Sequence, residues 1–369
     1  MTQQHQHRFI ASAAVLTGAA MLVCSAQVAD GVRQGLALCG QTLIPSLFPF
    51  MVLSIFISRS GASVFLGRLM RPLCRRWLRL PAAFGPVLLM SFLGGYPVGA
   101  RMLDGMLQRK EATPEEAARF LGFSVCPAPS FAVVTVGAGL LGSAKAGAVL
   151  YGCHLFTALL VGGWQARRTK APALHNTSFQ PLPFAPALVE ATAAAVEGML
   201  SICGFVLVFS VVLALLQASV IPALASAIAG FTGSFLSARA IAAALCGLLE
   251  VTCGIFSCKE LEWGTLCLLV PFLVSFGSFS VLCQLSACLH GKGIPMGRLL
   301  RGRLIHAALC TLMAAPLLYQ MQPALNAMAQ AARPLVRSDS ILSTLGLLGM
   351  CSLFLLSLGN ATPKEAKKQ

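Results

Sequence analysis

The stretch MSFLGGYPVGARML, residues 90–103, interrupts a long apolar run with residues that break helices. Gly94, Gly95 and Pro97 follow in close succession, and Arg101 ends the apolar character. Backbone amides and carbonyls cannot be left without hydrogen bonds in hydrocarbon, so irregular backbone at that depth occurs only where it is buried in protein or lines a wet cavity. In a membrane protein, this break therefore predicts a specialised site.

The composition indicates a membrane protein. Of the 369 residues, 57% are hydrophobic and 11% are charged, and the mean hydropathy is +0.79. A soluble domain carries about 25% charged residues, so this chain has too few polar side chains to cover a water-facing globule. We expect an all-α multi-pass protein of the cell membrane.

The net charge of +15 also fits a membrane protein. Basic cytoplasmic loops produce such an excess, and positive charge would concentrate anionic solutes at a pore mouth. The sequence shows no basic patch with interleaved aromatic residues, so we expect no nucleic-acid partner. Most of the 14 cysteines lie in apolar spans, the histidines are scattered, and Cys253 and Cys258 have no second ligand pair at zinc spacing. We therefore expect no metal and no cofactor.

Apolar spans and polar segments divide the chain. The predicted parts are an N-terminal transmembrane helix in 1–34, a first repeat in 35–168, a linker in 169–186, a second repeat in 187–320, and a C-terminal transmembrane helix at 341–358. Individual apolar runs at 9–29 and 43–58 are long enough to be membrane spans.

Two local signals are sharper than the rest. Residues 64–80 hold five arginines beside an apolar face, which is typical of a helix lying in the membrane interface. Thr113, Pro114 and Glu116 predict a helix N-terminus with a capping box, and this helix should run to about Ser124. The sequence CPAPS, residues 126–130, then breaks the helix.

Residues 86–103 and 270–286 look like copies of one another. Each has a proline-led apolar run, the dipeptide Ser-Phe, a break made of small residues, and further apolar residues. We therefore predict two structural repeats, each with a broken re-entrant helical hairpin, at 82–106 and 265–289. The alternative is a pair of ordinary kinked helices whose glycines permit close packing.

Four motifs carry a resemblance to a known family. The stretches LIPSLFPFMVLS, GGYPVGAR, LLEVTCGI and SFGSFSVLCQ resemble the sporulation integral membrane protein YlbJ family. That family belongs to the nucleoside-recognition or Gate domain proteins, which are related to concentrative nucleoside transporters. The resemblance covers about residues 35–318. The chain departs from the family pattern at VCPAPS and at Gly277-Ser278, where the family usually has Gly-Gly.

The resemblance implies an inverted-repeat transporter fold with paired hairpins. For the sporulation members it implies export of dipicolinate from the mother cell towards the forespore, through the outer forespore membrane. The expected partners are a small anionic solute, the lipid bilayer, a coupling proton or cation and, as an option, a second copy of the chain in a homo-oligomer.

The candidate substrate-binding residues lie at the breaks and on the neighbouring segments. They are Gly94, Gly95, Tyr96, Pro97, Arg101, Ser124, Ser130, Glu250, Thr252, Gly277, Ser278, Ser280 and Gln284. For each polar member, the alternative is that it only satisfies backbone groups freed by the break.

Glu250 and Arg101 are the two charged candidates. A carboxylate at the centre of a membrane helix costs at least about 2.5 kcal/mol, so Glu250 should face a cavity or a partner. It would carry a coupling proton or cation, or it would hold an arginine or hydroxyl structurally. Arg101 would bind a carboxylate of the solute in two-pronged fashion, or it would pair with Asp104 on the same helix face.

The predicted topology contains a conflict. Basic residues at 68–79, 167–170 and 298–303 all favour the cytoplasmic side. If residues 238–257 cross the membrane fully, both hairpins open to the same side; if they reach only partway, the hairpins oppose each other. We adopt the inverted repeat.

Three functions remain open at this point. The first is a transporter of a small organic anion, with dipicolinate as the implied solute. The second is a carrier of nucleosides or other small solutes with the same fold, and the third is a non-transporting assembly factor of the sporulation membrane. An enzyme is not expected, because the sequence has no nucleophile elbow, metal cluster or phosphate-binding loop.

Overall fold

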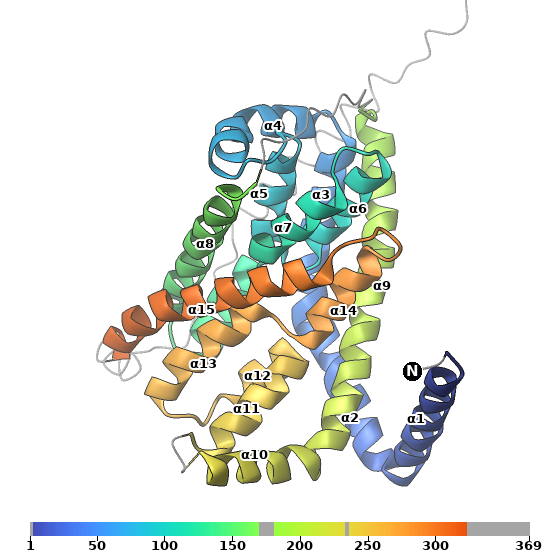
Figure 1. Ribbon diagram of the computed structural model, residues 1–369, viewed down its shortest axis with the longest axis vertical. Coiled ribbons are helices and arrows are strands. Elements are labelled where there is room, and N and C mark those ends of the chain that lie inside the picture. The colour runs from blue at the N-terminus through green and yellow to red at the C-terminus, as the bar shows by residue number, and fades with distance from the viewer. Residues whose placement is uncertain (1–2, 170–180, 233–235, 323–369) are drawn as a thin grey trace, which may run out of the picture.

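The computed structural model describes residues 3–169, 181–232 and 236–322 (Figure 1). Every regular element in these ranges is a helix, which confirms the predicted all-α class. Five helical stretches in the same ranges are long and apolar enough to cross a membrane: Ser25–Arg59, Ala144–Ala166, Phe184–Gln217, Trp263–Cys288 and Met296–Gln320. The predicted span at 341–358 and most of the predicted linker lie outside the described residues.

The N-terminal part differs from the two separate spans predicted at 9–29 and 43–58. Helix α1 (Gln3–Val23) ends before Cys24, and α2 (Ser25–Leu38), the π-helical turn η1 (Cys39–Leu43) and α3 (Ile44–Arg59) then form one continuous apolar stretch. Helix α1 points away from the other helices (Figure 1). The boundary falls at Cys24, whose backbone (φ −101°, ψ 38°) leaves the helical conformation.

The remaining elements fall into two halves, in chain order. The first half continues with α4 (Ala62–Pro72), η2 (Leu73–Trp77), α5 (Phe84–Gly94), α6 (Val98–Gln108), α7 (Pro114–Ser124), η3 (Phe131–Leu140) and α8 (Ala144–Ala166). The second half comprises α9 (Phe184–Gln217), α10 (Val220–Phe231), α11 (Ala238–Leu249), α12 (Val251–Ser257), α13 (Trp263–Phe276), α14 (Phe279–Cys288) and α15 (Met296–Gln320).

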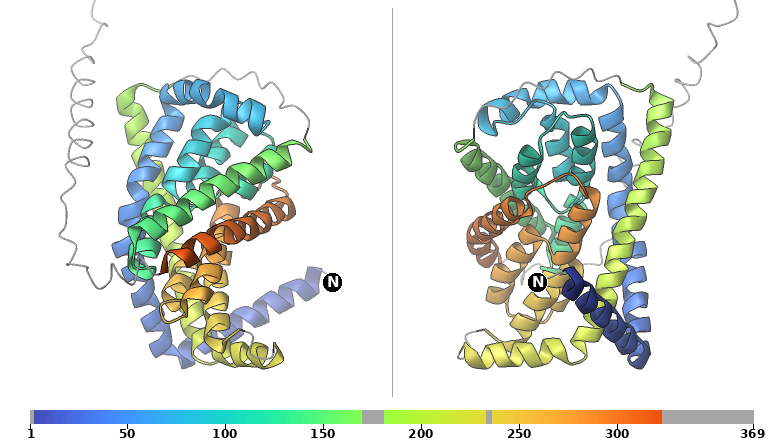
Figure 2. Two further views of the ribbon diagram at one scale, coloured as in Figure 1. Left: turned by 90° about the vertical axis from the view of Figure 1, so that its left-hand side faces the viewer. Right: turned by 45° about the vertical axis from the view of Figure 1, so that its right-hand side comes forward.

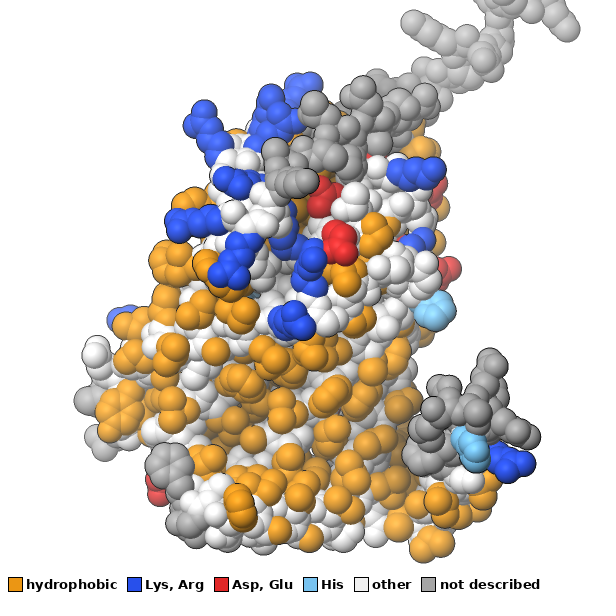
Figure 3. Space-filling view, viewed as in Figure 1, with side chains coloured by type: hydrophobic (Ala, Val, Ile, Leu, Met, Phe, Trp, Pro, Cys, Tyr) orange, Lys and Arg blue, Asp and Glu red, His pale blue; other side chains and the backbone are white. Residues whose placement is uncertain are grey.

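The helix expected at 64–80 is present as α4 and η2. Its apolar side chains Phe65 and Leu69 are 68% and 62% exposed, which is the arrangement expected where lipid covers that face. Lys and Arg side chains gather at this end of the molecule, whereas hydrophobic side chains cover the other end (Figure 3). The helix therefore lies on the basic end of the molecule.

Helices α5 and α6 form a tight antiparallel hairpin. Gly95 joins them with φ of +91°, in the left-handed region that favours glycine. A Cβ added to Gly99 would lie 2.1 Å from Ser91 Oγ, so the absence of a side chain lets α6 fold back against α5. The break predicted from GGYP is thus a reversal of the chain.

Helices α11 and α12 form a second hairpin, in the segment 238–257, which the sequence allowed to reach only partway across the membrane. Glu250 joins them in an extended conformation (φ −142°, ψ 119°). A Cβ on Gly254 would lie 2.0 Å from the Cα of Gly247, which shows how closely the two helices approach. Residues 238–257 therefore turn back on themselves instead of crossing as one rod.

The other two interruptions break helices without folding them back. Helix α7 ends at Ser124, the segment 125–128 is not helical, and η3 begins at Phe131. Helix α13 ends at Phe276, and Gly277 (φ +80°) leads into α14. The two segments of this broken helix diverge after the break: α13 packs along α15, whereas α14 packs against α9 and α6.

Residues 265–289 are therefore a broken helix, which differs from the predicted hairpin there. The physical reason lies in the side chains beside the break. Val281 stands four residues after Gly277, where Gly99 stands four residues after Gly95. A side chain at this position prevents the close approach of two helices that Gly99 allows at Ser91. The segment that resembles α5–α6 in its conformation is α11–α12.

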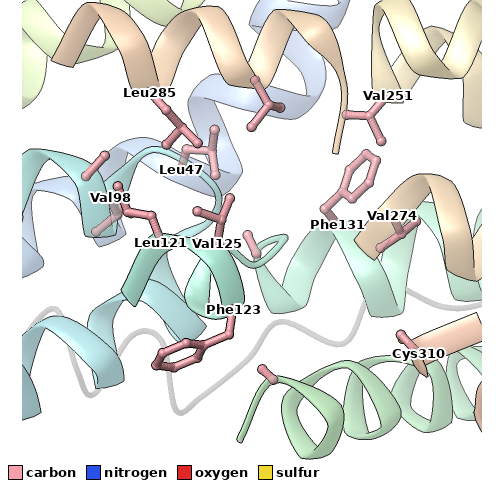
Figure 4. Packing of buried hydrophobic residues seen from close by; sticks show 14 of the residues in the cluster. Leu47, Val98, Leu121, Phe123, Val125, Phe131, Val251, Val274, Leu285 and Cys310 are labelled. Atoms are coloured by element: carbon pink, nitrogen blue, oxygen red, sulfur yellow. The ribbon is translucent and has the colours of Figure 1, made fainter. Parts of the chain in front are cut away.

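The order of elements after these corrections is the same in both halves. A hairpin (α5–α6 or α11–α12) precedes a broken helix (α7–η3 or α13–α14), and a long helix (α8 or α15) follows. The short helix before each hairpin, α4 or α10, lies at an end of the molecule, and these two ends are opposite (Figures 1 and 2). Side chains from both halves meet in one core, where Val251 lies beside Phe131 (Figure 4).

We expect Gly254→Ala to destabilise the protein by about 1–3 kcal/mol, because the new methyl group would force α11 and α12 apart. Thermal unfolding of the detergent-solubilised protein would measure the effect. Gly204→Ala is the matched control, since a Cβ there meets nothing within 4 Å. Equal unfolding temperatures for the two variants would contradict the close packing of this hairpin.

Candidate functional site

The first hairpin tip touches both broken helices. Tyr96 Oη donates a hydrogen bond of 2.8 Å to the carbonyl of Val274, near the C-terminal end of α13. A Cβ on Gly95 would lie 3.5 Å from the backbone nitrogen of Ala128, in the break between α7 and η3. The tip predicted as a binding element thus lies where the two broken helices meet.

The second hairpin tip brings a carboxylate to the same region. Glu250 is 3% exposed, and its side chain caps α12 by accepting a hydrogen bond of 2.7 Å from the backbone N–H of Cys253. Helix α12, which follows this tip, contacts both broken helices, η3 and α13. Both hairpins therefore pack against the two broken helices, and we call this meeting of tips and breaks the centre, although residues 265–289 are not the second hairpin.

A pocket reaches the second tip from the side of α2 and α9. Its volume is about 490 Å³, and its lining includes Gln41, Ser210, Cys253 and Ser257. The hydroxyl of Ser210 is buried and has no hydrogen-bond partner among the described residues. Because the backbone N–H of Cys253 donates to the Glu250 carboxylate, this pocket lies beside the second tip.

Arg303 of α15 ties the two broken helices together. Its side chain is fully buried, and Nε donates 3.2 Å to the carbonyl of Phe276. The other two guanidinium nitrogens donate to the carbonyls of Val125 and Ser275. The last carbonyls of a helix have no partner inside it, so one guanidinium satisfies acceptors at both breaks.

The buried charge of Arg303 is balanced by backbone dipoles. Within the described ranges, no carboxylate forms an ion pair with it. Arg303 was not among the predicted site residues, because it lies in the basic run at 298–303. The sequence does hold a signal that could have identified Arg303: Arg303, His306 and Cys310 are spaced so that they share one helix face. In the structure all three side chains are fully buried.

Two histidines occupy matching positions in the long helices. His154 and His306 are each the eleventh residue of α8 and α15, respectively. Their rings meet edge to face with centroids 4.5 Å apart. His154 Nδ1 lies 3.1 Å from Ser275 Oγ, and His306 Nε2 lies 3.1 Å from the carbonyl of His154. The pair therefore joins the two halves one turn away from Arg303.

Several predicted residues line this centre or lie beside it. The Oγ atoms of Ser124 and Ser130, which flank the first break, are buried without a partner among the described residues. Thr252 is buried in the first turn of α12. Gly94 and Pro97 lie at the first tip, as predicted.

Other predicted residues have local partners. Ser278 Oγ caps α14 by accepting from the backbone N–H of Val281 at 3.2 Å, and Ser280 Oγ accepts from Gln284 at 3.3 Å. The Ser278 bond satisfies a backbone group freed by the break, which is the alternative to solute binding stated above. The Ser280 bond joins two neighbouring side chains of the same helix. Gly277 provides the bend before α14.

Arg101 lies away from the tips, on the face of α6 that contacts α9. It donates 3.2 Å to the carbonyl of Gly198. The suggested pairing with Asp104 is absent, because the Asp104 carboxylate lies 3.3 Å from Lys292 Nζ and accepts from Gln108. Arg101 is therefore not grouped with Tyr96, Glu250 and Arg303.

Comparison with known proteins confirms the resemblance. Residues 41–144 match the Gate family, described as nucleoside recognition. The chain is also similar to the sporulation integral membrane protein YlbJ of Bacillus subtilis (strain 168), with 27% identity over 306 residues that cover 74% of each chain. No solved structure matches the chain.

The Gate segment supplies only part of the centre. It contains the first tip and the first break, whereas Glu250, Arg303 and the second break lie beyond its end at residue 144. Within the described ranges, no group of three His, Cys, Asp or Glu side chains is placed to hold a metal ion. Among the described residues, the tips and breaks bring the Arg303 guanidinium, the Glu250 carboxylate, hydroxyls and backbone groups to the centre.

We expect Arg303→Met to destabilise the protein strongly, at about 1–3 kcal/mol for each carbonyl left unpaired. Arg303→Lys should recover only part of the loss, because an ammonium group keeps the charge but cannot reach all three acceptors. Arg298→Gln on the exposed side of the same helix is the control, and it should change the unfolding temperature little. If all three variants unfolded alike, Arg303 would not hold the breaks together.

Proposed function

We propose that the chain is a secondary transporter of a small organic anion, with dipicolinate as the solute. The observation that carries this proposal is that two hairpins pack against two helix breaks, which the buried guanidinium of Arg303 bridges. Broken membrane helices in transporters place their free backbone groups at the solute site. The similarity to YlbJ supports a place in the sporulation membrane.

An anion suits the chemistry of this centre. Arg303 has no carboxylate partner in the described ranges, so a negative solute at the breaks would add a full counter-charge to the partial charges of the backbone carbonyls. The N-terminal ends of η3 and α14 begin at the two breaks, and helix N-termini favour anionic groups. Dipicolinate offers two carboxylates on a rigid ring, and a guanidinium binds a carboxylate with two parallel hydrogen bonds.

The repeated order of elements supports a mechanism of alternating access. We propose that the two halves are inverted copies, with α4 and α10 on opposite membrane surfaces. In such a fold, one half rocks against the other around a fixed site. The hairpins would then open the site to one side at a time.

Glu250 is suited to carry a coupling proton. Its carboxylate caps α12 through Cys253, which lines the pocket beside α2 and α9, and it has no cationic partner among the described residues. A charged carboxylate is costly at membrane depth, so protonation would remove the main barrier to moving this tip. Proton binding would thereby be linked to hairpin movement.

A nucleoside carrier of the same fold is the second candidate. The match of residues 41–144 to a family described as nucleoside recognition favours it. Nucleosides are neutral, so this candidate would leave the charge of Arg303 to the backbone carbonyls alone. A transport assay with both solute types separates the two.

Proteoliposomes containing the purified chain provide the test. Uptake of labelled dipicolinate, driven by an imposed pH gradient and compared with uptake of labelled uridine, should exceed that of empty liposomes. Uptake of uridine alone would favour the nucleoside carrier. Uptake of neither solute by correctly inserted protein would favour the assembly factor and reject the transporter.

We expect Glu250→Gln to abolish the dependence of transport on the pH gradient. The amide oxygen can still accept the hydrogen bond from Cys253, so the fold should be kept while the titrating proton is lost. The measurement is the uptake rate at several imposed gradients. Glu260→Gln, which alters an exposed carboxylate paired with Arg239, is the control. A wild-type response in Glu250→Gln would remove this residue from coupling.

A further inference from the structure

A second site lies on the outer surface, away from the tips. A groove of about 770 Å³ runs between η2, α8 and α15. Three arginines line one part of it, namely Arg76, Arg79 and Arg167, together with Trp77 and Trp164. The solute mechanism proposed above uses none of these side chains.

The basic rim of this groove is held in place. Trp77 Nε1 donates 2.9 Å to the carbonyl of Leu159 in α8, and Arg79 donates 3.0 Å to the carbonyl of Thr169 just beyond it. Arg79 also adopts φ of +47°, a left-handed conformation that is uncommon for a residue with a side chain. The hydrogen bonds fix Trp77 and Arg79 against α8, so these two side chains are positioned before any ligand arrives.

The charges of the rim have no acidic partner. Within the described ranges, no carboxylate forms an ion pair with Arg76, Arg79 or Arg167, and the groove lining contains no Asp or Glu. Three guanidinium groups at one end of a groove repel one another. An anionic group placed between them would relieve this repulsion.

The floor of the groove is apolar and opens sideways. Leu160 of α8 and Leu309 of α15 line it and are 41% and 40% exposed, and Ala308 leaves room between them. Tryptophan favours the level of the lipid headgroups, and Trp164 is 43% exposed at the basic end. The groove thus has arginines at one end, tryptophans beside them and an apolar floor along the rest of its length.

We propose that this groove binds an anionic diacyl phospholipid. The headgroup phosphate would lie among the three arginines, and one acyl chain would lie along the floor between α8 and α15. Basic pockets between transmembrane helices suit anionic headgroups, and the apolar floor distinguishes a lipid from free phosphate. The bound lipid would bridge the long helices of the two halves.

A second basic pocket serves as the comparison. It is smaller, at about 380 Å³, and is lined by Arg68, Arg71 and Arg75 of α4 and η2. Arg109 and Glu111 also line it and form an ion pair with each other, so this pocket has the same excess of three arginines as the groove. Removing two arginines from this pocket changes the total charge by the same amount without touching the groove.

The test is lipid binding to the full chain in neutral detergent, followed by native mass spectrometry and thermal unfolding. Phosphatidylglycerol should bind and raise the unfolding temperature, whereas phosphatidylcholine and glycerol phosphate should do neither at the same concentration. The double variant Arg76→Gln with Arg167→Gln should bind phosphatidylglycerol about thirtyfold more weakly, at roughly five- to tenfold for each charge. The double variant Arg68→Gln with Arg71→Gln should lose less than about threefold, because its charges lie outside the groove.

A third variant distinguishes the contribution of the apolar floor from that of the arginines. Ala308→Trp fills the floor and keeps every arginine, so it should also weaken phosphatidylglycerol binding. Equal losses in the two double variants would show diffuse attraction and overturn the site. Equal binding of phosphatidylcholine, or full binding by Ala308→Trp, would overturn it as well.

Discussion

The need to satisfy backbone polar groups at membrane depth governs this structure. Two hairpin tips and two helix breaks interrupt the described part of the chain in the interior, and each interruption frees amides or carbonyls that lipid cannot bind. Side chains meet part of this demand: Glu250 caps α12, Ser278 caps α14, and Arg303 donates to three carbonyls at both breaks. A single guanidinium therefore links α15 to α7 and α13, and the positions of these helices depend on it.

Close packing makes that link geometrically feasible. Gly302 precedes Arg303, and a Cβ there would lie 2.7 Å from the Cα of Gly122 in α7. The two backbones thus approach closely where the guanidinium reaches the end of α7. The pair of histidines, His154 and His306, adds a second contact between the halves at matching positions of α8 and α15. Small residues allow the backbones to approach, and buried polar groups form hydrogen bonds between the helices that meet there.

The same arrangement underlies the proposed solute site. The groups that satisfy the broken backbone are those that we propose bind the anion, and the hydroxyls of Ser124 and Ser130 remain without partners among the described residues. The centre combines residues of 41–144, which match the Gate family, with Glu250 and Arg303 of the second half, so both halves of the chain contribute polar groups to it. The surface groove between α8 and α15 has a different chemistry, with three arginines above an apolar floor. Solute and lipid would thus contact different faces of the same long helices.

The sequence by itself determined the features that depend on near neighbours. The capping box of Thr113 and Glu116, the break at CPAPS, the reversal at Gly95 and the all-α class were all predictable, because each follows from local backbone chemistry or composition. The tertiary structure alone decided which segments are partners. The Ser-Phe dipeptides suggested that residues 270–286 copy the first hairpin, yet the segment with that conformation is α11–α12, because the Gly247–Gly254 approach depends on how two helices meet. Arg303 looked like one more basic loop residue for the same reason: its three acceptors come from segments up to 178 residues away.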